Sequence, residues 1–137
     1  MKMRVLFWYC DQFDWVPAFQ ALPDAAAADP AENENCVVAF VHIEPQDVKP
    51  GSSVETKLVK NAKWLARKWQ ITNIILHSFT HLGEEKAEAG EARALLDRTQ
   101  KRLERAGYSV MQTPYGYFLD LKIQAKGHPL ARVFKQF

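Results

Sequence analysis

The sequence predicts an α/β fold in which a mixed sheet of about five strands and two main helices form two layers. Apolar runs and alternating segments of strand length recur along the chain, and two segments between them carry apolar residues at helical spacing. Their order is strand, strand, helix, strand, helix, strand, strand. The 137 residues are enough for a core of its own, so residues 1–137 are interpreted as a single domain.

The first half of the chain holds two strand signals. Residues 4–10 are a continuous apolar run, which is typical of a central strand covered on both faces. Residues 11–35 contain three prolines and an alanine-rich piece, so we expect a loop there with at most a short helix. Residues 36–44 form the second predicted strand, which ends at Pro45 and fits a hairpin with the first.

Two helices with one apolar face each are predicted further on. The first follows Ser52, which stands at capping-box spacing from Glu55, and its apolar stripe runs to Trp69. The second covers residues 84–106 and ends at Gly107. Residues 71–77 between the helices are the third strand, and the order of helix and strand suggests a crossover connection.

The segment 114–129 is the first functional candidate. After a fourth strand at residues 108–113, a turn with Pro114 and Gly116 leads into a strand with alternating apolar and polar residues. Lys126 and His128 stand where this core strand ends, and residues 130–137 are interpreted as a short amphipathic tail. Loops placed by rigid strands often carry binding sites. The alternative is a core strand with ordinary polar ends.

Residues 77–83 are the second candidate, because they follow the third strand and precede a predicted helix. Free N–H groups at a helix start can hold a carboxylate, a phosphate or a developing oxyanion. His77 and His81 straddle the strand end, so a shared metal is not expected, and a hydrogen-bonded core histidine is the alternative for each. These residues predict a polar, aromatic cleft between the loops of His81 and Tyr117.

Several function classes are excluded by the motifs and the charge. Neither a nucleophile elbow nor a glycine-rich nucleotide loop is present, so we expect no cofactor and no metal. The formal charge of +2 is too small to indicate nucleic-acid binding, and basic clusters on the helices are usually solvated. Cys10 and Cys36 are interpreted as buried free thiols in a reducing compartment. The apolar N-terminal run is too short to span a membrane, which predicts a cytoplasmic protein.

Four short motifs carry a resemblance to a known family. They are M-R-V-L at residues 3–6, S-F-T-H-L at 78–82, P-Y-G-Y-F at 114–118 and K-G-H-P-L-A at 126–131. In order and spacing they resemble the archaeal-type threonyl-tRNA synthetase editing domain over nearly the whole chain. The resemblance implies a D-aminoacyl-tRNA deacylase-like fold, a homodimer, and hydrolysis of serine wrongly attached to the tRNA for threonine. Because no synthetase domain follows Phe137, we expect a free-standing form that acts on tRNA in trans.

The resemblance also implies which residues form the site. Catalytic positions are His81, Tyr117 and Phe118. The positions that would bind the aminoacylated 3′ end of the tRNA are Ser78, Phe79, Thr80, Tyr115, Gly116, Lys126 and His128. In such a site backbone groups and the terminal ribose hydroxyls position the attacking water, so no triad is needed.

Three departures from the family leave alternatives open. Leu119 stands where the family has a lysine, Arg132 where it has an acidic residue, and residues 9–11 where it has His-Ser-Asp. One alternative is a tRNA- or protein-binding homodimeric module without catalysis. Another is a hydrolase of a different small ester or of D-aminoacyl-tRNA. A homodimer is also favoured by the apolar groups expected on the uncovered sheet face.

Overall fold

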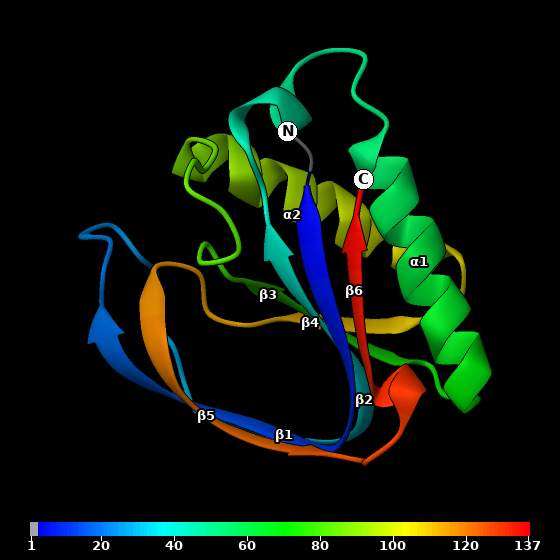
Figure 1. Cartoon of the computed structure of the whole chain (residues 1–137). Coiled ribbons are helices and arrows are strands. Elements are labelled where there is room, and N and C mark those ends of the chain that lie inside the picture. The colour runs from blue at the N-terminus through cyan, green and yellow to red at the C-terminus, as the bar shows by residue number, and fades with distance from the viewer. Residues whose placement is uncertain (1–2) are drawn as a thin grey trace.

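Residues 3–137 are described by a computed structural model and form one mixed sheet of six strands with two helices (Figure 1). The predicted fold class is confirmed, with one strand more than expected. In chain order the elements are β1 (Arg4–Gln20), β2 (Ala31–His42), the 3-10 turn η1 (Pro45–Val48), α1 (Val54–Trp69), β3 (Asn73–Ser78), α2 (Ala89–Arg105), β4 (Ser109–Gln112), β5 (Tyr117–Ala125), the 3-10 turn η2 (Pro129–Ala131) and β6 (Arg132–Gln136).

The strand order is β4-β3-β2-β1-β5, and β6 also pairs with β1. The β2–β3 and β3–β4 pairs are parallel and are connected through α1 and α2, which confirms the predicted crossover. β1 and β2 form the expected antiparallel pair. Figure 1 shows β1 bending, with β6 beside its first half and β5 beside its second half.

The loop expected at residues 11–35 is wrong for most of its length. β1 continues to Gln20, β2 begins at Ala31, and only the segment between them lies outside the strands. Phe13 and Trp15 are buried, and the ladders to β2 and β5 satisfy the backbone around them. Pro17 is accommodated because the register with β5 shifts there, where a missing N–H is tolerated.

Three further element assignments differ from the sequence-based prediction. The tail forms β6, which completes the edge of β1. α2 begins at Ala89 rather than at residue 84. The capping box does not form at α1, because Ser53 is the N-cap and the Glu55 carboxylate instead accepts hydrogen bonds from Arg98 and Arg102.

β5 has the predicted alternation but is an edge strand rather than a core strand. Leu119 and Leu121 are half-buried, while Phe118 and Asp120 are exposed. The apolar face ends early, since Ile123 is 38% exposed. Only the first half of β5 therefore packs apolar side chains against the rest of the protein.

The two faces of the sheet have separate apolar clusters. One lies between the sheet and both helices, and the other lies on the opposite face around Phe13, Phe40 and Ile75. Cys10 and Cys36 are partners across β1 and β2 in the second cluster, and both are buried free thiols as predicted. Burial raises the pKa of each thiol to about 12, so neither is a nucleophile at neutral pH.

The turn before β5 gives a stability prediction. Gly116 has φ +89°, and a Cβ there would lie 2.8 Å from the Ala25 Cβ and 3.2 Å from the Leu22 Cβ. We expect Gly116→Ala to lower the free energy of unfolding by about 2–4 kcal/mol, from left-handed strain plus crowding. Gly51→Ala, at φ +86° with no atom near its Cβ, is the control and should cost about 1–2 kcal/mol. Urea denaturation measures both, and equal losses would contradict the crowding.

Candidate functional site

A cleft of about 400 Å³ lies between the loop that follows β3 and the turn that precedes β5. Most of the predicted site residues line it, namely Ser78, Phe79, Thr80, His81, Tyr115, Gly116, Tyr117 and Phe118. The two groups are separated by α2 and β4 in the sequence. The fold thus brings together the two loops between which the sequence predicted a cleft.

The first wall is the loop of residues 79–88, which is tied at one end to β2 and at the other to the residue that follows β2. The Phe79 N–H donates to the Val41 carbonyl and the Ala87 N–H to the Ile43 carbonyl, each at 2.9 Å. Between them, the Glu85 carbonyl lies 2.6 Å from Nε2 of the buried His42. The loop is therefore positioned by the sheet although it has no regular structure of its own.

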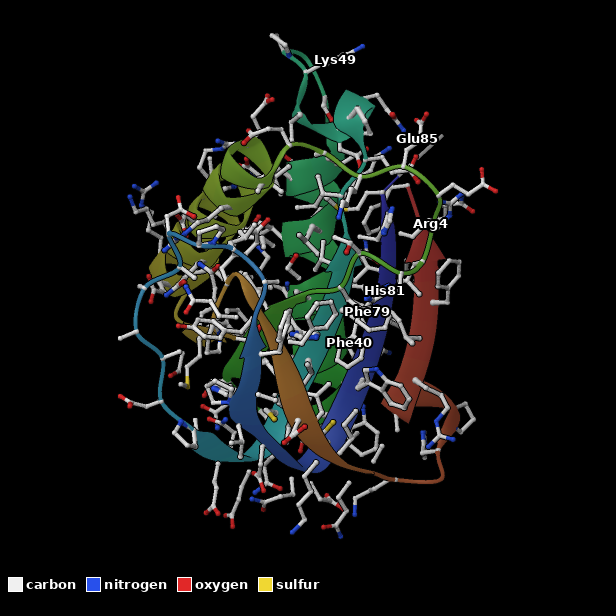
Figure 2. All side chains as sticks on the ribbon, turned by 90° about the vertical axis from the view of Figure 1, so that its left-hand side faces the viewer. Arg4, Phe40, Lys49, Phe79, His81 and Glu85 are labelled. Carbon is white, nitrogen blue, oxygen red and sulfur yellow. The ribbon has the colours of Figure 1, made fainter. Side chains whose placement is uncertain are left out.

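A partly buried ion pair lies against the same loop. Arg4 of β1 pairs with Glu44, whose side chain is 1% exposed. Gly83 passes directly over this pair, and a Cβ there would collide with the Arg4 guanidinium and lie 3.2 Å from the Glu44 carboxylate. Only glycine fits this close approach without a shift of the pair. Figure 2 shows Arg4 and Glu85 near each other, above His81 and Phe79 in the view.

The second wall is the turn of residues 113–118, which is held from two directions. The Tyr115 hydroxyl donates to the Ala89 carbonyl at 3.2 Å, and burial raises the pKa of this phenol. The Gly116 carbonyl accepts hydrogen bonds from Ala21 and Leu22 at 2.7 and 3.1 Å. The Tyr117 hydroxyl donates to the Ala26 carbonyl at 2.8 Å. Both tyrosine hydroxyls are thus engaged with the backbone.

The two histidines of the first wall have different environments. His77 is 8% exposed, and its Nδ1 lies 2.8 Å from the Thr113 hydroxyl. Burial, and secondarily the nearby His81, lowers the pKa of His77 to about 4, so its ring is neutral at pH 7. His81 is exposed at the cleft, with its ring 5.0 Å from Phe79 and 6.5 Å from Phe118. His77 matches the interpretation as a hydrogen-bonded core histidine, and His81 is the accessible one.

Backbone donors are available at the loop rather than at the helix start. Within residues 3–137 the N–H groups of Thr80 and His81 have no backbone acceptor, whereas that of Leu82 closes the turn at residues 79–82. The expectation that α2 offers free N–H groups is wrong for its first turn, because the Glu88 carboxylate accepts from Gly90 and Glu91. These hydrogen bonds lower the pKa of Glu88, and its carboxylate therefore occupies the N–H groups at the start of α2.

Lys126 and His128 lie outside the cleft. The Lys126 ammonium is 3.0 Å from the Asp11 carboxylate, and His128 Nδ1 accepts the Leu130 N–H at 3.0 Å at the start of η2. β5 separates them from the turn at Gly116, and an extended strand of this length spans about 30 Å. They hold the β5–β6 connection together in this structure, and their part in substrate binding stays a prediction.

The two departures in this region also have definite positions. Leu119 lines the cleft and packs against the cluster around Phe13 and Phe40, so an apolar side chain stands where a cation was expected from the resemblance. Arg132 donates to the Lys126 carbonyl at 2.8 Å and lies over the Trp8 ring at 5.8 Å. Arg132 therefore belongs to the β5–β6 connection and not to the cleft.

Sequence reasoning missed part of the cleft. Its unexpected lining residues include Ala21, Leu22, Ile43, Lys86 and Thr113. Ala21 and Leu22 follow β1, in a segment interpreted as loop. The alternation of Phe13 and Trp15 with polar neighbours was the available signal that the strand continued toward them.

Residues 3–137 contain no group of three or more His, Cys, Asp or Glu side chains placed to hold a metal ion. In that part of the chain, no helix combines the length and the apolar character needed to cross a bilayer.

Comparison with solved structures identifies the class of fold. A probable eukaryotic D-amino acid tRNA deacylase superposes with a TM-score of 0.64 at 13% identity, over 100% of this chain and 99% of that one. A c-Myc DNA unwinding element binding protein superposes with a TM-score of 0.67 at 8% identity, over 96% and 97% of the two chains. The fold is that of the D-aminoacyl-tRNA deacylases, as the resemblance implied.

Sequence comparison gives the family. Residues 3–137 match the archaea-specific editing domain of threonyl-tRNA synthetase, and the chain belongs to this family. Threonine–tRNA ligases from Pyrococcus furiosus and Methanopyrus kandleri are both 28% identical to it over 96% of its length. The ligase of Methanocaldococcus jannaschii is 24% identical over 98%. The chain spans only 21–22% of these relatives.

The buried histidine gives a pH prediction. Because the pKa of His77 is about 4 in the folded state and near 6.5 when exposed, the unfolded chain takes up a proton first as the pH falls. Stability present above pH 6.5 is therefore lost on the way to pH 4. Between pH 7.5 and 4.5 this group should cost about 2–3 kcal/mol of unfolding free energy. His77→Asn, compared by urea denaturation at both pH values, should lose less than the wild type, and equal losses would contradict the assignment.

Proposed function

We propose that this chain is a proofreading aminoacyl-tRNA deacylase that acts in trans, with seryl-tRNA for threonine as its substrate. The observation that carries the proposal is the cleft, in which the two loops that bear the motifs at residues 78–82 and 114–118 meet around His81 and Tyr117. The relatives are threonine–tRNA ligases, and the structural neighbours include a probable D-amino acid tRNA deacylase. The same observations support the aminoacylated 3′ end of a tRNA as the ligand of the cleft.

The reaction needs little from side chains. Water attacks the ester carbonyl, the bond from that carbon to the ribose oxygen breaks, and the proton of the water passes to the leaving oxygen. The developing oxyanion would meet the free N–H groups of Thr80 and His81. His77 is neutral and buried beside Thr113, so it shapes the cleft without supplying charge. His81 would contact the side chain of the amino acid.

A binding module without catalysis is the second candidate, and Leu119 favours it. Leu119 places an apolar group on the cleft wall, and the lysine among the lining residues is Lys86 of the other wall. If the backbone N–H groups alone stabilise the oxyanion, the chain would still be a hydrolase, but a slower one or one with another substrate. Action on another ester or on D-aminoacyl-tRNA is the remaining possibility on the same scaffold.

The homodimer and the cytoplasmic location belong to this proposal as well. Phe134 of β6 is 53% exposed, and the second face of the sheet carries a cluster around Phe13 and Phe40 with half-buried Leu6 and Trp8 at its margin. A second copy of the chain would cover such a surface.

The test is hydrolysis of a panel of L- and D-aminoacyl-tRNAs, led by seryl-tRNA for threonine. We expect the wild type to release serine and His81→Ala to lower kcat/KM about 10- to 100-fold, because one hydrogen bond to the substrate is lost. Ser109→Ala, on β4 outside this cleft, is the control and should keep the wild-type rate.

Two results would overturn the proposal. The absence of hydrolysis across the whole panel, by a chain that still binds uncharged tRNA, would establish the binding module. Hydrolysis that is insensitive to His81→Ala would move the reaction away from this cleft.

A further inference from the structure

An exposed pair of phenylalanines stands at the mouth of the cleft. Phe19 near the end of β1 is 64% exposed, and Phe118 near the start of β5 is 54% exposed, the two largest exposed fractions among the large hydrophobic side chains of residues 3–137. Their rings lie 6.0 Å apart and are tilted by 44°. Such a pair in water is unexpected unless a partner covers it.

The pair continues a row of rings that leads out of the cleft. Phe40 and Phe79 lie 5.0 Å apart, Phe79 and His81 5.0 Å, and His81 and Phe118 6.5 Å. Figure 2 shows Phe40, Phe79 and His81 following one another between β5 and the first half of β1. Phe118 lines the cleft, whereas Phe19 lies beyond the lining. Phe19 is therefore the next aromatic group outside the site.

The backbone under the pair is fixed in advance. Phe19 and Phe118 are direct partners in the β1–β5 ladder, next to Gln20 and Tyr117. Just beyond them, the Gly116 carbonyl accepts hydrogen bonds from the backbone N–H groups of Ala21 and Leu22. The side-chain amide of Gln20 donates to the Leu22 carbonyl at 2.9 Å. A surface held this way loses little conformational freedom when a ligand binds.

We propose that Phe19 and Phe118 form a stacking platform for the base that precedes the terminal adenosine of a bound RNA 3′ end. The inference rests on the proposed function, since it takes the terminal aminoacyl nucleotide to occupy the cleft. The next nucleotide outward then meets the mouth, where two open aromatic faces offer contact to any base. Stacking on aromatic side chains is the usual way in which proteins hold single-stranded RNA without reading its sequence. Phe19 is thus a positioning residue for long substrates.

The direct test uses an uncharged oligoribonucleotide that ends in C-C-A, with 2-aminopurine in place of the penultimate base. The wild type should quench its fluorescence on binding. Phe19→Ala should lose the quenching and weaken binding about 10-fold or more, the size of one lost base stack. Phe19→Trp should retain both. Trp64→Ala removes an exposed aromatic side chain from α1, outside the cleft, and should behave as the wild type.

A second arm compares hydrolysis of seryl-tRNA with hydrolysis of 3′-seryl-adenosine. Phe19→Ala should raise KM for the tRNA about 10-fold and leave kcat/KM for the single nucleoside unchanged, because only the longer substrate reaches the platform. A purely structural role would lower both rates together and would overturn the proposal.

The remaining outcomes are also decisive. Unchanged quenching in Phe19→Ala would overturn the platform. So would a change from dimer to monomer in that variant by light scattering, because a second copy of the chain would then be the partner. If the wild type hydrolyses no ester but shows quenching that depends on Phe19, the platform stands and the deacylase proposal fails.

Discussion

The ladder between β1 and β5 holds one wall of the cleft over the other. β1 is long enough to pair with β2 along one edge and with both β6 and β5 along the other. Its second half carries β5 across the face of the sheet that the helices leave uncovered, and the turn at Gly116 comes to rest beside the loop of His81. Without this ladder the same loops would lie at a sheet edge with no opposing wall.

The opposite wall depends on buried polar contacts instead of regular structure. His42 binds the Glu85 carbonyl of the loop after β3, and Gly83 of that loop lies against the Arg4–Glu44 pair. Burying a carboxylate is costly unless its partner stays close, so this arrangement favours a single position of the loop. The cleft thus combines a wall fixed by a strand ladder with a wall fixed by a salt bridge and backbone hydrogen bonds. Such rigidity suits a site whose donors are backbone N–H groups, since these cannot reorient as side chains do.

Local patterns predicted the elements, and pairing over long sequence distances accounts for what they missed. The alternation in residues 117–125 and the helical stripes were sufficient for β5, α1 and α2. The second half of β1 was missed because Asp11, Asp14 and Pro17 are poor strand residues by themselves, and partners on both sides outweigh that preference. Phe19 was missed with it.

In the candidate site too, local patterns predicted part of the arrangement, and the positions of the strands in space decide the rest. Residues 78–81 and 115–118 were predicted to share a cleft, and they do. Lys126 and His128 were grouped with them because they bracket the same strand, yet an extended strand places its two ends far apart. In this structure Lys126 pairs with Asp11 and His128 caps the start of η2, and their part in substrate binding stays a prediction.

The central claim is that the cleft receives the aminoacylated 3′ end of a tRNA. It is tested most directly by titrating the isotope-labelled chain with the non-hydrolysable amide analogue 3′-seryl-amino-3′-deoxyadenosine and following backbone amide shifts by NMR. We expect saturable shifts in residues 78–82 and 115–118. Shifts confined to the β5–β6 connection, or none at millimolar analogue, would contradict it.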